Sequence, residues 1–334
     1  MALVGLVQHR ARVQPVEHQP LAADEVEADG LAVLDQLVGT AARGAEAYFG
    51  FGLPPALLEA APGLRWAQSG AAGVRGILTP AVRDAVGAGR LTLTNAAGVM
   101  AVPIAEYVVG GVLYFLRGLD VAAAQQRAGV WDRAPWAKPA AGGADALPRE
   151  VSECRVLVVG VRGIGGGAAE RLTALGAECV GVRRSADGEA PPGFARVVAA
   201  DGIDAELPGA DVVVLAAPST PETDGLLDAR RIALLPAGAI VVNVGRGALV
   251  DEPALARALA EGRLRGAVLD VASREPLPPE SPLWTLPNVL LTPHVSPTSP
   301  GRFWGRMLDL FVDNWDRYRR GVPLRNVVDA GAGY

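Results

Sequence analysis

The first hundred residues alternate short apolar runs with stretches of helical spacing. The apolar runs, each of a length suited to a strand, are residues 1–7, 45–49, 64–67 and 91–94. The stretches with helical spacing are residues 54–61 and 80–88. Strands that are separated by helices predict parallel pairing through right-handed crossovers. We therefore expect this part of the chain to form an α/β layer.

A longer helical pattern spans residues 102–116 and is apolar nearly all round. Pro103 falls in its first turn, where a missing N–H is tolerated. A helix that is apolar on every side is buried inside a domain or packed against a partner subunit. The stretch is too short for a membrane span, and it contains Glu106 and is followed by Arg117.

The pattern changes after residues 129–150, whose proline, glycine and alanine content is typical of a connecting segment. Short β-branched or apolar runs then recur. These candidate strands are residues 155–159, 179–182, 212–216, 240–244, 267–271 and 289–292. Residues 168–175 have helical spacing, and Gly176 is a suitable end for that helix. The alternation predicts a doubly wound parallel sheet between about residues 151 and 295.

Length and charge set bounds on the function. The chain has 334 residues, of which 50% are hydrophobic, enough for two domains with buried cores. A net charge of −5 with a pI near 5.4, and no basic run, argues against a nucleic-acid partner. No segment resembles a signal peptide or a membrane span, so we expect a cytoplasmic protein without a membrane partner.

The two cysteines, Cys154 and Cys179, show neither C-x-x-C spacing nor a Cys/His pattern that would hold a metal ion. Each lies in a strand-like run. We therefore predict buried free thiols rather than a disulfide, and no metal site.

A glycine-rich turn follows the candidate strand at residues 155–159. Gly160 and Gly165 occupy the first and third positions of the G-x-G-x-x-G dinucleotide fingerprint, and Arg162 stands at the second. A glycine there normally lets the backbone approach the pyrophosphate, and a side chain obstructs that approach. Either Gly163 takes over this role in a shifted turn, or the Arg162 guanidinium contacts the phosphate directly. A plain tight turn is the alternative to a dinucleotide site.

The next strand ends in two arginines. Arg183 lies 23 positions after Gly160, where a dinucleotide site usually carries an acidic residue for the ribose 2′-hydroxyl, and Arg184 follows it. A carboxylate repels a 2′-phosphate, whereas guanidinium groups attract one. We therefore predict NADP as the preferred cofactor and NAD as the alternative. A solvated strand end, with Arg183 stacked on the adenine, is the other interpretation.

Histidine occurs at positions 9, 18 and 294. His9 and His18 lie in a polar stretch and are expected to be solvated. His294 follows a candidate strand, at the carboxyl edge where open α/β sheets bind ligands. Arg246 and Glu275 follow two further candidate strands, with Glu275 29 positions after Arg246 and 19 before His294. Each residue on its own has a structural alternative to a catalytic role. Arg246 could donate hydrogen bonds to backbone carbonyls at the start of a helix, and Glu275 could be a solvated acid in a loop.

Three sequence blocks around these residues resemble the D-isomer-specific 2-hydroxyacid dehydrogenases. The block N-x-x-R-G-x-x-V-D-E-x-A-L of that family is similar to residues 243–255. The blocks D-V-x-x-x-E-P-L and T-P-H are similar to residues 270–277 and 292–294. The separations also match the family, and the similarity covers nearly the whole chain. Glyoxylate/hydroxypyruvate reductases and phosphoglycerate dehydrogenases are the members it resembles.

The resemblance implies the fold and the domain organisation. It implies a Rossmann-type doubly wound parallel sheet inserted in a second, flavodoxin-like α/β substrate domain. The substrate domain is expected to comprise residues 1–98 and 298–334, and the dinucleotide-binding domain residues 99–297. In this family the first helix of the latter is a dimer arm, so the apolar stretch at residues 102–116 implies a homodimer.

The resemblance also implies the roles of the site residues. His294 is expected to donate a proton to the substrate carbonyl oxygen, Glu275 to orient its imidazole, and Arg246 to bind the substrate carboxylate. Residues 66–74 resemble the substrate loop, in which the expected contacts are Ala71, Ala72 and Gly73. The expected cofactor contacts are Gly160, Arg162, Gly163, Ile164, Gly165, Arg183, Arg184, Ala217, Pro218, Val244, Gly245 and Asp270.

The function implied is that of an NAD(P)-dependent reductase of a small 2-oxo acid, such as glyoxylate or hydroxypyruvate, to the 2-hydroxy acid. The lack of a C-terminal extension argues against a regulated phosphoglycerate dehydrogenase. A catalytically silent NAD(P)-binding sensor or corepressor on the same fold is the alternative. It draws support only from Arg162, whereas the complete catalytic set favours an enzyme. Substrate specificity is expected to depend on Gln68, Ser69, Met100 and Trp284.

Overall fold

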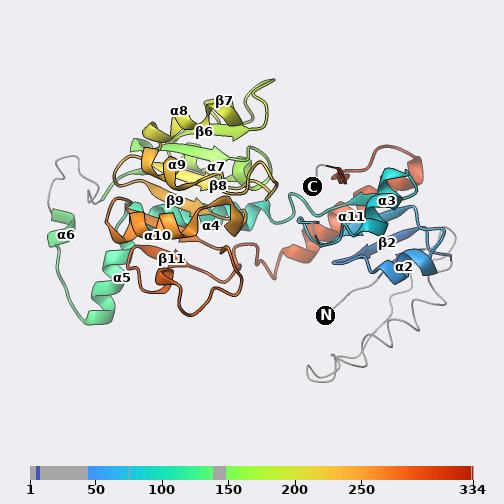
Figure 1. Ribbon diagram of the computed structural model, residues 1–334, viewed down its shortest axis with the longest axis horizontal. Coiled ribbons are helices and arrows are strands. Elements are labelled where there is room, and N and C mark those ends of the chain that lie inside the picture. The colour runs from blue at the N-terminus through green and yellow to red at the C-terminus, as the bar shows by residue number, and fades with distance from the viewer. Residues whose placement is uncertain (1–4, 8–43, 75, 138–147, 332, 334) are drawn as a thin grey trace. The chain divides into compact units, whose positions relative to one another are not determined.

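The computed structural model describes residues 5–7, 44–74, 76–137, 148–331 and 333 (Figure 1). The chain divides into two compact units. Unit 1 comprises residues 1–99 and 300–334, and unit 2 comprises residues 100–299. His9 and His18 lie outside the described residues.

Unit 1 contains a four-stranded sheet in the order β1-β2-β3-β4. The strands are β1 (Gly5–Val7), β2 (Ala47–Gly50), β3 (Trp66–Ser69) and β4 (Thr92–Thr94). Strands β2, β3 and β4 are parallel, as predicted. Strand β1 pairs antiparallel with β2, so the prediction of parallel pairing is wrong for this strand. An antiparallel strand is common at the edge of an otherwise parallel sheet, because its pairing needs no right-handed crossover.

The described residues of unit 1 include the helices α2 (Pro55–Ala60), α3 (Pro80–Gly87) and α11 (Phe303–Arg320). Helices α2 and α3 lie where helical spacing predicts them. The Thr79 side chain caps α3 by accepting a hydrogen bond from the Val82 N–H. Helix α11 packs aromatic rings against β3, since the Trp66 ring stacks on Phe311 with a centroid distance of 5.4 Å.

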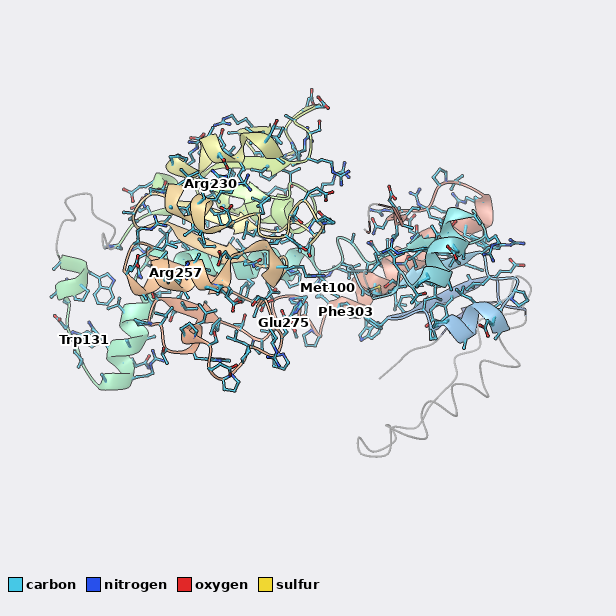
Figure 2. The ribbon with its side chains drawn as sticks, viewed as in Figure 1. Met100, Trp131, Arg230, Arg257, Glu275 and Phe303 are labelled. Atoms are coloured by element: carbon cyan, nitrogen blue, oxygen red, sulfur yellow. The ribbon has the colours of Figure 1, made fainter. Side chains whose placement is uncertain are left out.

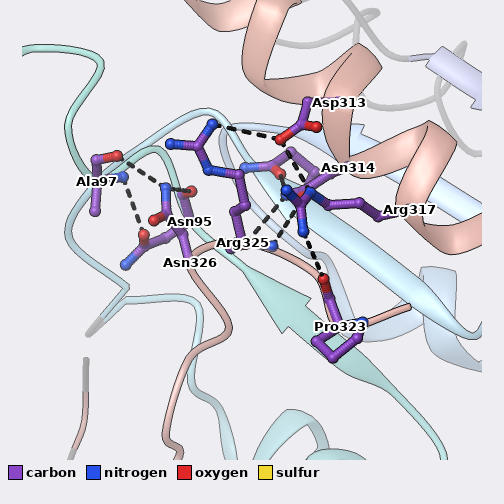
Figure 3. A network of polar contacts seen from close by, with 9 residues as sticks. Asn95, Ala97, Asp313, Asn314, Arg317, Pro323, Arg325 and Asn326 are labelled. Atoms are coloured by element: carbon purple, nitrogen blue, oxygen red, sulfur yellow. Dashed lines mark hydrogen bonds and ion pairs between the residues drawn. The ribbon is translucent and has the colours of Figure 1, made fainter.

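Side-chain amides join the C-terminal segment of unit 1 to its sheet (Figure 3). Asn326 donates hydrogen bonds to the carbonyls of Asn95 and Ala97, at 3.2 and 2.8 Å. Asn314 in α11 donates to the Gln68 side-chain oxygen at 3.0 Å. Thr94 donates to the same oxygen, and Gln68 has no exposed surface. The Gln68 side chain is therefore a hydrogen-bonded part of the core, and its role in specificity stays a prediction.

Unit 2 is a seven-stranded, wholly parallel sheet in the order β11-β10-β9-β8-β5-β6-β7. The strands are β5 (Arg155–Val159), β6 (Glu178–Arg183), β7 (Arg196–Ala199), β8 (Val212–Leu215), β9 (Ile240–Asn243), β10 (Gly266–Leu269) and β11 (Val289–Leu291). The predicted doubly wound sheet is confirmed. The strand order reverses between β5 and β8, and such a switch point opens a ligand crevice at the carboxyl ends of the strands.

Helices cover both faces of this sheet (Figure 1). The covering helices are α4 (Ala101–Leu116), α7 (Ile164–Ala174), α8 (Ile203–Glu206), α9 (Ala229–Leu234) and α10 (Glu252–Ala260). Helices α5 (Leu119–Ala128) and α6 (Ala134–Ala137) follow α4 and extend away from the sheet (Figure 1). Short 3-10 turns occur at Val151–Glu153, Ala200–Gly202, Leu207–Gly209, Gly247–Leu249 and Pro282–Trp284. Alternate strand residues point to opposite faces, so the sheet separates two apolar clusters.

Helix α4 lies on one face of the sheet, where Val108, Val112 and Phe115 are fully buried. A Cβ at Gly111 would lie 2.8 Å from Val268, so this glycine permits the close approach of helix and sheet. Among the described residues no single helix is long and apolar enough to cross a membrane. The pair α4 and α5, bent by 69°, meets that criterion only when the two are taken together.

Both cysteines are buried and free, as predicted. Burial raises the pKa of the Cys154 thiol to about 11 and also raises the pKa of Cys179. Neither thiol is therefore an activated nucleophile.

Candidate active site

The predicted residues of unit 2 gather at one edge of its sheet. Because the strands are parallel, the loops that follow β5, β8, β9, β10 and β11 all leave from this edge. Arg246 follows β9, Glu275 lies in the loop after β10 (labelled in Figure 2), and His294 follows β11.

The structure brings His294 and Glu275 together. The imidazole Nδ1 lies 2.9 Å from the Glu275 Oε2. The other carboxylate oxygen of Glu275 accepts a hydrogen bond from the Ala272 N–H at 3.2 Å. The two side chains are 44% and 42% exposed, so the pair faces solvent. With Nδ1 engaged, Nε2 is the ring nitrogen that can face a ligand.

The Glu275 carboxyl is held in its ionised form. Partial burial raises its pKa, but hydrogen bonds from His294 and Ala272 and the positive charges of His294 and Arg246 outweigh burial. The net pKa of Glu275 therefore lies below its ordinary value. An ionised carboxylate on Nδ1 favours the protonated imidazole and fixes its orientation.

Arg246 is fixed by the loop after β9. The buried Asn243 side chain donates to the Arg246 carbonyl at 3.0 Å and accepts from the Gly245 N–H at 3.1 Å. The Arg246 guanidinium donates to the Gly245 carbonyl at 2.6 Å and is otherwise exposed. A Cβ at Gly247 would collide with the Ala272 backbone. This glycine therefore lets the loop of Arg246 lie against the loop of Glu275.

His294 has a left-handed backbone, with φ of 55°, which side chains branched at Cβ avoid and other non-glycine residues rarely adopt. Asp270 holds it there. The Asp270 carbonyl accepts from the His294 N–H at 2.9 Å, and the buried carboxylate accepts from the N–H groups of Val295 and Ser296 at 2.9 and 3.1 Å. Asp270, predicted as a cofactor contact, thus bonds the loop that carries His294.

The glycine-rich turn after β5 is packed too closely for side chains at two of its positions. A Cβ at Gly160 would lie 2.8 Å from the Ala216 carbonyl oxygen, and one at Gly165 would collide with the Gly160 carbonyl. Gly163, with φ of 50°, caps α7, whose first N–H groups have no partner within the helix. Three glycines are therefore required here, and the backbone is open at the start of α7, as a pyrophosphate needs.

Arg162 is exposed in this turn, and its guanidinium makes no hydrogen bond or ion pair with any residue that the structure describes. The other predicted cofactor residues line the same edge. Ala217 and Val244 are buried beside the turn, Gly245 packs against the Ala217 carbonyl, and Pro218 is exposed.

Arg183 has a different environment from the one that the sequence suggested. Its guanidinium donates to the Ser185 carbonyl at 2.7 Å, to the Asp187 carbonyl, and to the Gly188 carbonyl at 3.4 Å. It therefore closes the loop that follows β6. Arg184 is exposed beside it. The Ser185 hydroxyl donates to the Asp187 carboxylate, which places a negative charge in the same loop.

The predicted substrate loop follows β3 in unit 1. The carbonyls of Ala71 and Ala72 accept hydrogen bonds from the Ala96 N–H and the Asn95 side chain, both at 3.0 Å. The N–H groups of Ala72 and Gly73 make no hydrogen bond within the described residues. These two groups are available to an anionic ligand.

Comparison with known proteins gives a consistent result. Residues 109–296 match the family described as D-isomer specific 2-hydroxyacid dehydrogenase, NAD binding domain. Glyoxylate/hydroxypyruvate reductase A of Salmonella newport is 33% identical over 236 residues, which cover 70% of each chain. An uncharacterised protein of Streptomyces coelicolor is 36% identical over 84% of this chain and 93% of its own.

Two solved structures are also similar. A D-isomer specific 2-hydroxyacid dehydrogenase of Xanthobacter autotrophicus, in complex with NADPH and MES, superposes with a TM-score of 0.74, at 32% identity, covering 87% of this chain and 86% of its own. An NADPH-dependent glyoxylate/hydroxypyruvate reductase of Sinorhizobium meliloti, in complex with NADP and sulfate, has a TM-score of 0.73 at 30% identity and covers 87% of both chains.

Proposed function

The chain belongs to the D-isomer specific 2-hydroxyacid dehydrogenase family, and from that membership we propose that His294 is the proton donor in the reduction of a small 2-oxo acid. The protein is an NAD(P)-dependent oxidoreductase acting on 2-hydroxy acids. The observation that carries the proposal is the 2.9 Å contact between the His294 Nδ1 and Glu275, with Arg246 in the adjoining loop.

The glycines after β5 suit a dinucleotide, because Gly160 and Gly165 tolerate no side chain and the start of α7 is open. When bound, the reduced nicotinamide supplies the hydride. The first N–H groups of α7 and the Arg162 guanidinium would hold the pyrophosphate. Asp270, Ala217, Pro218, Val244 and Gly245 stay predicted contacts of the nicotinamide half.

The protein groups act on the substrate as follows. Negative charge develops on the carbonyl oxygen during reduction, and His294 Nε2–H donates its proton to that oxygen. Glu275 keeps Nδ1–H engaged, which leaves Nε2 as the donor and stabilises the imidazolium. Arg246 presents a permanent cation with a planar fork, which suits the substrate carboxylate. The N–H groups of Ala72 and Gly73, with Ala71, stay predicted contacts of the substrate.

We propose NADP(H) as the preferred cofactor. The support is the pair Arg183 and Arg184 in place of an acidic residue, and the presence of NADPH or NADP in the two similar solved structures. Arg183 donates to carbonyls of its own loop and Arg184 is exposed beside it, so both guanidinium groups stay candidates for the 2′-phosphate. The negative charge of the Asp187 carboxylate in the same loop repels a 2′-phosphate. The ratio of kcat/KM for NADPH to that for NADH therefore measures which of the two charges prevails.

Glyoxylate and hydroxypyruvate are the proposed substrates, because similar proteins are named as their reductases. A homodimer and a cytoplasmic location stay predictions. A catalytically silent NAD(P)-binding sensor or corepressor stays the alternative, and its support is Arg162 in the glycine-rich turn.

The direct test is oxidation of NADPH and of NADH by the purified protein with a panel of small 2-oxo acids. We expect turnover with glyoxylate or hydroxypyruvate and a higher kcat/KM for NADPH. Absence of turnover with every 2-oxo acid, together with retained NADPH binding, would support the silent sensor. A higher kcat/KM for NADH would contradict the cofactor preference alone.

A further inference from the structure

A tyrosine of α4 reaches the loop that carries His294. The Tyr107 hydroxyl lies 2.6 Å from the Thr292 Oγ1. The Thr292 hydroxyl in turn lies 2.6 Å from the Asp270 Oδ1. Tyr107, Thr292 and Asp270 thus form a continuous chain of short hydrogen bonds from a helix to the carboxyl edge of the sheet.

The direction of each bond in this chain is determined by proton count. The Asp270 carboxylate oxygens accept from Thr292, Val295 and Ser296 and donate to none of them. Thr292 must therefore use its one hydroxyl proton on Asp270. Tyr107 is then the donor to Thr292. Burial is the main cause that raises the pKa of Tyr107 to about 12, so the phenol keeps this proton at any working pH.

The chain ends on the backbone around His294. Asp270 binds this backbone through its main chain and its side chain. Its carbonyl accepts from the His294 N–H, and its carboxylate accepts from the N–H groups of Val295 and Ser296. The left-handed φ of 55° at His294 is kept by these contacts. The Asp270 carboxylate therefore holds the backbone that carries the imidazole, and Thr292, together with Tyr107 behind it, holds the Asp270 Oδ1 in place.

We propose that Tyr107 is a positioning residue for the reaction: its hydroxyl, through Thr292 and Asp270, holds the His294 loop in the orientation that donates the proton. The proposal rests on the proposed role of His294. The phenol ring packs against the apolar cluster on the α4 face of the sheet, and a phenylalanine ring fills the same space. The Tyr107 hydroxyl can therefore affect catalysis only through its hydrogen bond to the loop, and Tyr107→Phe removes this bond while it keeps the packing of the ring.

The test compares Tyr107→Phe and Thr292→Val with two matched variants. Tyr114→Phe removes a hydroxyl from the same helix, and the Tyr114 hydroxyl makes no hydrogen bond within the described residues. Thr292→Ser keeps the hydroxyl and removes only a methyl group. We expect Tyr107→Phe and Thr292→Val each to lower kcat about tenfold with NADPH affinity unchanged. Tyr114→Phe and Thr292→Ser should keep kcat within about twofold.

Two further readouts separate positioning from a general loss of stability. The double variant Tyr107→Phe/Thr292→Val should be no slower than the slower single variant, because both changes break one chain of bonds. The thermal midpoint of Tyr107→Phe should lie only a few degrees below that of Tyr114→Phe, as the loss of about one hydrogen bond requires. Additive losses, or a lowered midpoint with unchanged kcat, would overturn the proposal. If His294→Ala kept full turnover the proposed function itself would fail, whereas an inactive His294→Ala with a fully active Tyr107→Phe would refute only the role of Tyr107.

Discussion

Replacing Glu275 by glutamine tests the electrostatic part of the account. The amide keeps the size of the side chain and can still accept from the His294 Nδ1–H, so the variant removes the charge while the contact remains. Glu275 is ionised at neutral pH, because hydrogen bonds and nearby positive charges lower its pKa despite partial burial. The variant therefore removes a full negative charge.

The size of the effect follows from the geometry. The oxygen and nitrogen are 2.9 Å apart, and a unit charge pair at such a distance is worth about 1 kcal/mol in water and about four times as much near a protein surface. Both side chains are more than 40% exposed, so solvent screening keeps the value near the lower limit, about 1–1.5 kcal/mol. Since about 1.4 kcal/mol is a factor of ten, we expect kcat for reduction to fall about tenfold at neutral pH.

The pH dependence gives the sign. Protonation neutralises Glu275 in the wild type, whereas Glu275→Gln is neutral at every pH, so the difference in kcat should narrow as the pH falls through the lowered pKa of Glu275. The assay is NADPH oxidation across the pH range, with Glu280→Gln as the control because Glu280 is an exposed acid of the same loop. A profile for Glu275→Gln that coincides with that of Glu280→Gln would refute the reasoning.

Two other perturbations test the cofactor turn and the fold. Arg162→Gly restores the usual glycine, and we expect it to weaken NADP⁺ binding about tenfold, since hydrogen bonds to charged groups contribute about 1.5–3 kcal/mol and this one is exposed. The control ligand is adenosine 2′-monophosphate, which lacks the pyrophosphate and should bind to the variant and the wild type equally. Tighter binding of NADP⁺ to Arg162→Gly would show that the arginine obstructs the site. Glu206 is buried beside Arg196 and Arg155, and the hydrogen bond from Arg196 is the main cause of its lowered pKa. A carboxyl whose pKa falls on folding stabilises the fold above its unfolded pKa and loses this contribution as the pH falls through the folded pKa. Glu206→Gln should therefore lower the free energy of unfolding by about 1–3 kcal/mol at neutral pH, and the difference from the wild type should shrink below about pH 4. Urea titrations at neutral pH and below about pH 4 measure this difference. An equal difference under the two conditions would contradict the prediction.

Much of unit 2 could be predicted from the sequence because its strands are buried on both faces. Such strands are continuous β-branched runs, and β5 (Arg155–Val159) has the bounds that the pattern predicts. Helical spacing is evident only from residue 168, four residues after α7 begins, because three consecutive glycines have low helix propensity. Packing decides there, since a Cβ at Gly167 would already touch Ala105 of α4. Strand β7 was missed because it is a short edge strand with partly exposed residues.

For the candidate site, too, residues in local sequence patterns could be predicted, whereas contacts between residues distant in the sequence could not. Arg246, Glu275 and His294 could be identified because each follows a strand at the same edge and their spacing matches a family pattern. The hydrogen bonds that hold the loop of His294 could not be predicted from the sequence. Tyr107 and Thr292 are 185 positions apart, and no periodicity connects them. Arg183 had the expected place but not the expected contacts, because the carbonyls of the following loop turn back onto its guanidinium.

The central claim is that His294 donates the proton, and the measurement that tests it most directly is the turnover of His294→Ala beside its affinity for NADPH. General acid catalysis contributes about 10²–10⁴ in rate, so kcat should fall by that factor. The dissociation constant of NADPH, measured by the fluorescence of the bound cofactor, should stay within about twofold, because the glycine-rich turn and α7 are untouched. A variant that binds NADPH normally and reduces a 2-oxo acid at the wild-type rate would contradict the account.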